Sequence, residues 1–256
     1  MERVSPSDRD PVIIVENLTA RYDDVTILEN VSFEVYRGER FMILGGSGCG
    51  KSTLLKHMIG LLKPSSGRVL INGIDITQAD ERWLQQVRRQ IGVLFQADAL
   101  FGSMSLAQNV ALPLTEYTDL SPELVREIVK MKLGLVDLSG YDNHMPAELS
   151  GGMRKRAGLA RAMALDPMFL FFDEPWAGLD PVTAAELDIL IRSINEGIGT
   201  TMVFVTQELA SIFNLGQRVI MLHKEARGII ARGTPAELRE KSTDSRVMNF
   251  FNRHAV

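Results

Sequence analysis

Residues 45–53 read GGSGCGKST, namely Gly45, Gly46, Ser47, Gly48, Cys49, Gly50, Lys51, Ser52 and Thr53. Glycines at this density let a backbone wrap closely around an anion, because they have no Cβ and tolerate unusual dihedral angles. Residues 40–44 (RFMIL) form a nearly continuous apolar run, which is typical of a buried strand. An amphipathic pattern on the other side predicts a helix over residues 51–62. A strand, a glycine-rich turn and a helix in this order predict a phosphate-binding loop.

The lysine and the serine of this loop carry its chemistry. The free N–H groups and the positive dipole end of the following helix would face the phosphates. Lys51 would add a point charge at the outer phosphates, and the Ser52 hydroxyl would be a ligand of Mg²⁺. We therefore predict that residues 45–53 bind a nucleotide. Cys49 would offer only its backbone N–H, since the sequence shows no paired base that would activate its thiol.

Two acidic residues follow a second apolar stretch. Residues 169–172 (FLFF) predict a buried strand, and Asp173 and Glu174 come directly after it. A parallel strand delivers the residues at its C-terminal end to the ligand-binding edge of a sheet. Asp173 would hold Mg²⁺, and Glu174 would be the general base that polarises an attacking water. Taken alone, the pair would favour a solvated strand end, but the phosphate-binding loop favours the catalytic interpretation.

The remaining pattern is that of an α/β protein. Short strands are predicted at residues 12–15 and 31–35, with turn-rich sequence between them, and at 68–71, 91–95, 201–205, 219–222 and 228–231. Helical periodicity dominates residues 97–157, and helices are also predicted between 172 and 201, at 235–241 and at 246–252. Strands alternate with helices in the core, so the helical third is an insertion. The first ten residues predict a flexible leader.

The composition excludes several classes of protein. The 256 residues carry a net charge of −4, whereas a duplex-DNA-binding protein usually has a basic surface. A single cysteine excludes an internal disulfide and a cysteine metal cluster. No apolar run approaches the ~18 to 20 residues of a spanning helix, and the polar start lacks the apolar core of a secretory signal. A role at a membrane would therefore need partner subunits.

A third motif lies between the two predicted sites and comprises Leu149, Ser150, Gly151, Gly152 and Met153. With the loop and the carboxylate pair in this order, the chain resembles the ABC ATPase family, whose signature is LSGGQ. The resemblance covers about residues 12–235. It implies an α/β P-loop NTPase (RecA-like) core, an antiparallel β subdomain and an inserted helical subdomain at about 97–157. The implied domains are a leader at 1–10, a nucleotide-binding domain at 11–240 and a helical tail at 241–256.

The resemblance also implies roles for single residues. Tyr22 would stack on the adenine, and Gln96, after the strand at 91–95, would act in catalysis and at Mg²⁺. Asp180 ends the stretch 177–180 (AGLD), which resembles the family's D-loop. Ser150 and the three residues after it would head a helix and face the γ-phosphate bound by a second chain. The implied enzyme is an ATPase, with ATP and Mg²⁺ as cofactors, that works as a head-to-tail homodimer.

Several stretches resemble one subgroup of the family, the MlaF-type ATPases. They are residues 95–101 (FQADALF), 145–148 (MPAE), the signature variant that ends in Met153, and 244–247 (DSRV) with Phe250 and Phe251. These ATPases energise phospholipid transport between the bacterial inner and outer membranes. The subgroup implies a multi-span MlaE-like permease, a lipid-binding MCE-domain protein and a STAS-domain subunit as partners. It also implies that no nucleic acid is a binding partner, and that the chain is a peripheral protein on the cytoplasmic face of the inner membrane.

One position departs from the pattern of the family. The family places a histidine after the strand at 201–205, and this chain has Gln207 there. A glutamine amide can donate a hydrogen bond to a phosphate oxygen, but it cannot become cationic or exchange a proton. We therefore expect slower hydrolysis, with closure on ATP retained. The histidines are out of register and are interpreted as surface or packing residues: His57, His144, His223 and His254.

The sequence leaves three alternatives open. The nearest alternative to a lipid transporter is the same motor in an amino-acid or other small-solute importer. A soluble ABC ATPase that acts on DNA or ribosomes usually has coiled-coil arms or a second cassette, and this chain shows neither. A pseudo-ATPase that binds ATP only as a switch would fit Gln207, but Lys51, Asp173 and Glu174 argue against it.

Two further sets of residues have a simple and a functional interpretation. The first set would line a groove for a permease helix or would pack the insertion's own core, and the insertion would move relative to the core around Gln96. It consists of Ala99, Leu100, Phe101 and Met104. The second set, Arg154, Lys155 and Arg156, predicts a charged helix face, because three charges fall short of a lipid-binding cluster.

Overall fold

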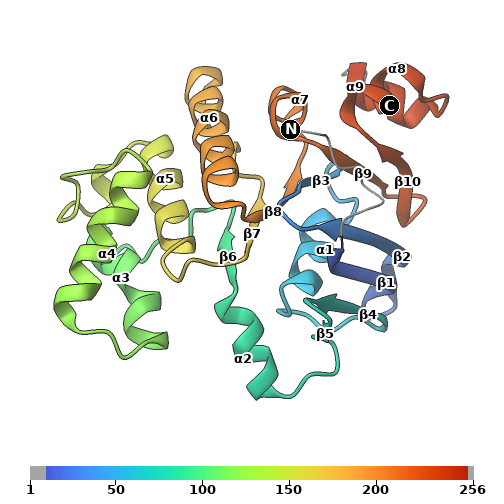
Figure 1. Ribbon diagram of the computed structural model, residues 1–256. Coiled ribbons are helices and arrows are strands. Elements are labelled where there is room, and N and C mark those ends of the chain that lie inside the picture. Colours follow the sequence, from blue (N-terminus) through green and yellow to red (C-terminus); the bar gives the residue numbers. More distant parts are fainter. Residues whose placement is uncertain (1–9, 253–256) are drawn as a thin grey trace.

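The computed structural model describes residues 10–252. The predicted flexible leader lies outside these residues except for Asp10, as do the last four residues of the predicted tail, among them His254. Figure 1 shows the helical insertion at one end of the molecule and an antiparallel sheet toward the other end. In the described part of the chain, no helix is both long and apolar enough to cross a membrane.

The central sheet has six strands in the order β10-β9-β3-β8-β7-β6. They are β3 (Arg40–Leu44), β6 (Ile91–Leu94), β7 (Phe169–Asp173), β8 (Thr201–Thr206), β9 (Arg218–His223) and β10 (Gly228–Gly233). Neighbouring strands pair in parallel, except that β10 is antiparallel to β9. β7 and β8 are buried along their whole length, as expected of strands covered on both faces. The predicted α/β core is confirmed, and each of these strands lies within two residues of its prediction.

The second sheet is antiparallel and has the order β2-β1-β4-β5. It consists of β1 (Pro11–Tyr22), β2 (Val25–Tyr36), β4 (Ser66–Ile71) and β5 (Ile74–Asp75). The turn-rich segment predicted between residues 15 and 31 is wrong, because β1 and β2 continue through most of it. Asn17 and Asn30 have positive φ near irregularities in the pairing, so they interrupt the apolar alternation without ending the strands.

The helices next to the first sheet differ from the prediction in two respects. α1 (Lys51–Met58) ends four residues before the predicted end, and Gly60 then turns the chain with a φ of 70°. α2 (Glu81–Arg89) lies outside every predicted element. It buries only Val87, so its apolar side is too narrow to produce a helical pattern in the sequence.

The insertion is formed by three helices, α3 (Leu106–Tyr117), α4 (Pro122–Leu135) and α5 (Gly151–Ala162), with a short 3-10 helix at Pro146–Glu148. Each of the three begins after a serine, Ser105, Ser121 or Ser150, whose side chain accepts a hydrogen bond from the backbone N–H three residues later. α5 continues through the predicted boundary at residue 157 and packs against β6. It therefore joins the insertion to the central sheet.

The remaining helices are α6 (Pro181–Ile198), α7 (Leu209–Leu215), α8 (Pro235–Lys241) and α9 (Ser245–Asn252). Alternate residues of β3 divide the hydrophobic core into two clusters. Met42 and Leu44 pack in the cluster that includes the insertion and α6. Phe41 and Ile43 pack in the cluster that includes α1 and the antiparallel sheet. The central sheet is thus covered on both faces, and its strand ends are held in fixed positions.

Gly92 on β6 allows α5 to approach the sheet closely. A Cβ at this position would lie 2.1 Å from Ala162 O and 2.7 Å from Leu170 Cδ2. We expect Gly92→Ala to lower the free energy of unfolding by about 1–3 kcal/mol, the usual range for overpacking a core. Urea unfolding measures this change. The matched control is Gly197→Ala on α6, where nothing lies within 4 Å of the added methyl group and alanine should stabilise the helix by up to ~1 kcal/mol. Equal stability of both variants would contradict the close packing.

Candidate functional site

A cavity of about 360 Å³ lies at the edge of the central sheet where its parallel strands end. Its walls come from the segments that follow β3, β6, β7 and β8. The lining residues are Ser47, Gly48, Lys51, Ser52, Gln96, Glu174, Trp176, Ala177, Gly178, Leu179, Gln207 and Glu208. Parallel strands bring their C-terminal ends to one edge, so the topology gathers motifs that are far apart in the sequence.

The glycine-rich loop before α1 has a backbone that side chains would block. Gly45 has a φ of 148°, and a Cβ there would lie 2.5 Å from both Cys49 Sγ and Leu222 O. Gly50 is left-handed with a φ of 100° and directly precedes the first residue of α1. The first turn of α1 has no capping side chain, so its N–H groups are available to an anion held in the loop. Burial raises the pKa of the Cys49 thiol, so the thiol is neutral at pH 7.

Lys51 is buried, and its ammonium group points back at the loop. Its Nζ donates hydrogen bonds to Gly45 O at 2.9 Å and Gly46 O at 3.2 Å. The same Nζ lies 3.4 Å from Glu174 Oε1, in an ion pair that solvent barely reaches. The charge of Lys51 is thus held at the centre of the loop, where the outer phosphates of a bound nucleotide would lie.

Ser52 and Asp173 form the part of the site that suits a divalent cation. Ser52 Oγ donates a hydrogen bond to Asp173 Oδ1 at 2.9 Å, although the two residues belong to α1 and β7. A hydroxyl and a carboxylate are the oxygen donors that Mg²⁺ prefers, and Mg²⁺ completes its shell with phosphates and water. Within residues 10–252, no three His, Cys, Asp or Glu side chains are grouped to hold a metal by themselves. The donor set therefore fits Mg²⁺ that arrives with a nucleotide.

Glu174 is held in a strained conformation between two strands. Its φ of 46° is left-handed, which is unfavourable for a residue with a side chain. Its N–H donates to Val205 O at 2.9 Å, and its Oε2 accepts from the Gln207 N–H at 3.3 Å. Such strain persists only when the surroundings fix it, and it is common at functional sites. The carboxylate is consequently held beside Lys51 and the end of β8.

Gln207 lies where the strand β8 ends, in the wall of the same cavity as Glu174. The histidines that the structure describes, His57, His144 and His223, are absent from the lining of this cavity. His57 is a packing residue: its Nδ1 lies 3.0 Å from Leu62 O, and burial lowers its pKa. In this wall, Gln207 therefore stands directly after β8, at the position where the family places a histidine.

Several predicted site residues lie outside this cavity. Ser150 caps α5 through a 3.3 Å hydrogen bond from the Met153 N–H, and none of the residues 150–153 lines the cavity. Asp180 caps α6 and accepts from the N–H groups of Val182 and Thr183, and the hydrogen bonds from Thr183 lower its pKa. Tyr22, at the end of β1, is half exposed. In one chain, therefore, the signature does not reach the glycine-rich loop.

The structure corrects the interpretation of Lys155 as part of a charged helix face. Lys155 is buried, donates to Gln96 O, and lies 2.8 Å from Asp98 Oδ1. Trp176 is a further lining residue that the sequence reasoning missed. No signal in the sequence indicated the pairing of Lys155 with Asp98, because Lys155 lies between Arg154 and Arg156 in a run of three basic residues. Trp176 gave none beyond its place two residues after Glu174.

The set at residues 99–101 and 104 was predicted either to line a groove for a permease helix or to pack the core of the insertion. The structure shows residues of both kinds in this set. Leu100 packs against the core of the insertion, whereas Phe101 is half exposed. The guanidinium of Arg161 lies 5.9 Å from the centre of the Phe101 ring. Only part of this set therefore offers free surface, and the remainder stabilises the insertion.

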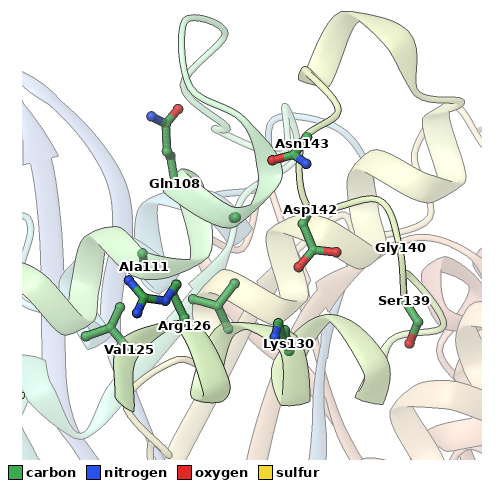
Figure 2. Close-up of a pocket in the computed structure, with 11 residues that line it drawn as sticks. Gln108, Ala111, Val125, Arg126, Lys130, Ser139, Gly140, Asp142 and Asn143 are labelled. Carbon is green, nitrogen blue, oxygen red and sulfur yellow. The ribbon is translucent and has the colours of Figure 1, made fainter. Parts of the chain in front are cut away.

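A larger cavity of about 770 Å³ lies in the insertion, between α3, α4 and the loop at residues 139–143. Figure 2 shows Asp142 and Asn143 of the loop above Arg126 and Lys130 of α4. The two basic side chains pair with Glu123 and Glu127 of their own helix. No residue of the sequence motifs lines this cavity. The chemistry is therefore assigned to the smaller cavity.

Comparison with known proteins identifies the family of this chain. A family model described as ABC transporter matches residues 28–177. The MlaF ATP-binding protein of an intermembrane phospholipid transport system in Haemophilus influenzae is 41% identical over 94% of this chain and 90% of its own length. A probable ribonucleotide transport ATP-binding protein, mkl, of Mycobacterium leprae is 43% identical over 95% of this chain and 70% of its own length.

A solved structure with a similar fold is a dimeric ATP-binding cassette, MJ0796, in a post-hydrolysis state bound to ADP and Pi. It has a TM-score of 0.79 and 32% identity, and the match covers 87% of this chain and 98% of the cassette. The fold and the family resemblance predicted from the sequence are both confirmed. The chain therefore belongs to the ABC transporter family as one of its ATP-binding, ATP-hydrolysing subunits, with ATP and Mg²⁺ as cofactors.

Proposed function

We propose that two copies of this chain close head to tail around two Mg-ATP and drive a membrane permease that moves phospholipids. The observation that carries the head-to-tail arrangement is the separation of two anion-binding helix starts. The loop before α1 lines the cavity with Glu174, while the start of α5 at Ser150 does not. A second chain would bring its Ser150 to the open side of this cavity, and the dimeric cassette structure supports such pairing.

The site residues have separable roles in this proposal. Residues 45–53 hold the phosphates, and Tyr22 stacks on the adenine. Lys51 neutralises the outer phosphates, while Ser52, Asp173 and Gln96 hold Mg²⁺, which when bound stabilises the charge of the transferring phosphoryl group. Glu174 orients and deprotonates the attacking water, which its fixed carboxylate suits. Asp180, at the start of α6, would contact the partner chain.

Gln207→His tests whether glutamine at this position slows hydrolysis. A neutral donor bond is about 1 kcal/mol weaker than one from a charged group, which corresponds to about fivefold in rate. We expect Gln207→His to raise kcat by about fivefold, with little change in ATP affinity. Phosphate release is measured beside Gln78→His, which places the same side chain in an exposed loop away from the cavity. A clear fall of kcat in Gln207→His alone would contradict the expectation.

The similar proteins name two different classes of transported substrate. The MlaF relative supports phospholipids, and the resemblance at 95–101 and 145–148 points the same way. The mkl relative has the same level of identity and a different named substrate, ribonucleotides. A small-solute importer is therefore the second candidate, because the ATP-binding chain does not carry the transport pathway itself.

Isolation of the assembled transporter separates these candidates. The tagged full chain would be purified from detergent-solubilised membranes of its own host, and its partners and bound lipids identified by mass spectrometry. We expect a multi-span MlaE-like permease, an MCE-domain protein, a STAS-domain subunit and bound phospholipid, with this chain peripheral on the cytoplasmic face of the inner membrane. A permease without phospholipid, whose ATPase is stimulated by a nucleotide or an amino acid, would overturn the lipid assignment.

A further inference from the structure

The turn that carries Gln96 is fastened to the helix that begins at the signature. Lys155 of α5 donates from Nζ to Gln96 O. The same Nζ lies 2.8 Å from Asp98 Oδ1. The lysine and the carboxylate form an ion pair at this distance. Both side chains are buried, and Lys155 is only 3% exposed. Solvent therefore screens this contact weakly.

Two arginines of α5 add to the same attachment. Arg161 donates to Ala99 O at 2.6 Å and to Asp98 O at 3.2 Å. Arg154 Nε lies 3.5 Å from Asp98 Oδ2. Three basic side chains of one helix, Arg154, Lys155 and Arg161, thus contact residues 96–99. The attachment joins the point where the chain enters the insertion to the helix by which it leaves.

The conformation of the turn depends on this attachment. Asp98 and Ala99 have φ angles of 62° and 53°, so two adjacent residues with side chains are left-handed. Neighbouring structure must fix such a conformation, because the isolated backbone disfavours it. The contacts from Lys155 and Arg161 are made to the backbone and the side chain of these residues. Removal of Lys155 should therefore release the turn and alter the position of Gln96.

We propose that Lys155 is a positioning residue, which holds Gln96 in its own ATP site and makes it move with the signature helix. This inference rests on the proposed roles of Gln96 and Ser150. Ser150 caps the start of α5 five residues before Lys155, and Gln96 lines the cavity of Glu174. Closure of Ser150 on the partner's nucleotide would then set Gln96 in the first chain at the same time.

The buried ion pair between Lys155 and Asp98 favours a role in positioning Gln96 over a role in stability alone. A buried ion pair is often no more stabilising than apolar residues of the same volume, because both charges lose their hydration. A buried pair does fix geometry, since an unpaired buried charge is costly. An apolar contact would hold α5 and the turn together without fixing the positions of the Gln96 carbonyl and the Asp98 carboxylate.

A double-mutant cycle of ATP hydrolysis tests this role on the purified full chain. Lys155→Met should lower kcat about tenfold while KM for ATP changes by less than about twofold, since a misplaced group near the reacting atoms slows chemistry. In the Gln96→Ala background, the same Lys155→Met change should lower kcat by less than about twofold, because its target is already gone. Lys155→Arg keeps the charge and the donor, and it should retain most of the activity.

Lys132→Met is the matched control for loss of a buried lysine. Lys132 is also 3% exposed and pairs with Asp166, but it lies on α4 and does not line the Glu174 cavity. The Lys132→Met substitution should reduce thermal stability and leave kcat unchanged. If Lys155→Met does not fold, Asp98→Asn enters the same cycle, since it removes the charge without changing the side-chain volume.

Each outcome decides the inference. Equal falls of kcat from Lys155→Met in the parent and in the Gln96→Ala background would overturn it, as would a fall of kcat in Lys132→Met of the same size. Failure of the proposed function is seen separately, because the unmodified chain would then neither hydrolyse Mg-ATP nor dimerise with it.

Discussion

Lys51→Ala is expected to lower kcat/KM for ATP by about 100- to 1,000-fold, the usual effect of losing one preorganised group that stabilises developing charge. Lys51 is the cation held inside the glycine-rich loop by Gly45 O and Gly46 O, and no other lysine or arginine lines this cavity. Its loss would leave the outer phosphates without a positively charged side chain from this cavity. Calorimetric titration with Mg-ATP measures the loss of nucleotide affinity, and steady-state phosphate release measures the loss of turnover.

Lys56→Ala on the same helix is the control for this prediction. Lys56 is exposed on α1 and does not line the cavity, so its removal changes the net charge equally without touching the site. Its kcat/KM should stay within about twofold of the parent, as surface substitutions usually do. If both variants lost activity to the same extent, the loop would not be the phosphate-binding site.

Glu174→Gln is expected to lower kcat by about 100- to 10,000-fold, the range for loss of a general base. Binding of Mg-ATP should be kept or strengthened. The Glu174 carboxylate lies 3.4 Å from Lys51 Nζ, and its negative charge repels the negatively charged phosphates that Lys51 would bind. Single-turnover hydrolysis and nucleotide binding measure the two quantities independently. Glu116→Gln, an exposed residue of α3, is the control.

The Glu174 variant distinguishes a base from a structural residue. Glutamine has the same shape as glutamate and can still accept the hydrogen bond that the Gln207 N–H gives. The fold of the site should therefore survive the change. A variant that hydrolyses ATP at the parent rate would contradict the assignment of Glu174, and one that no longer binds ATP would show a structural role instead.

The central sheet could be predicted from sequence because its strands are buried on both faces. Residues 40–44 and 169–172 are apolar runs that end directly at the glycine-rich loop and the carboxylate pair. β1 and β2 were underestimated because their bulges place Asn17 and Asn30 where an apolar residue was expected. α1 was overestimated because the apolar pattern continues past Met58, although Gly60 already turns the chain.

The motifs of the site could be predicted, but the connections between them could not. Spacing in a sequence shows that Lys51, Asp173 and Glu174 follow strands, and parallel topology then brings them together. The contact of Lys155 with Gln96 joins residues that are 59 positions apart in the chain. It depends on how α5 lies against β6, which is a matter of tertiary packing around Gly92. A run of three basic residues gives no sign of which one is buried.

The sandwich of a nucleotide between two chains is tested most directly by the mass of the Glu174→Gln variant in sedimentation, with and without Mg-ATP. We expect a monomer without nucleotide and a dimer with it, because slow hydrolysis traps the closed state. We further expect that adding Ser150→Glu, which places a negative charge at the start of α5, keeps the protein monomeric while each chain still binds ATP at Lys51. A Glu174→Gln protein that stays monomeric with saturating Mg-ATP, or a dimer that Ser150→Glu leaves intact, would contradict the account.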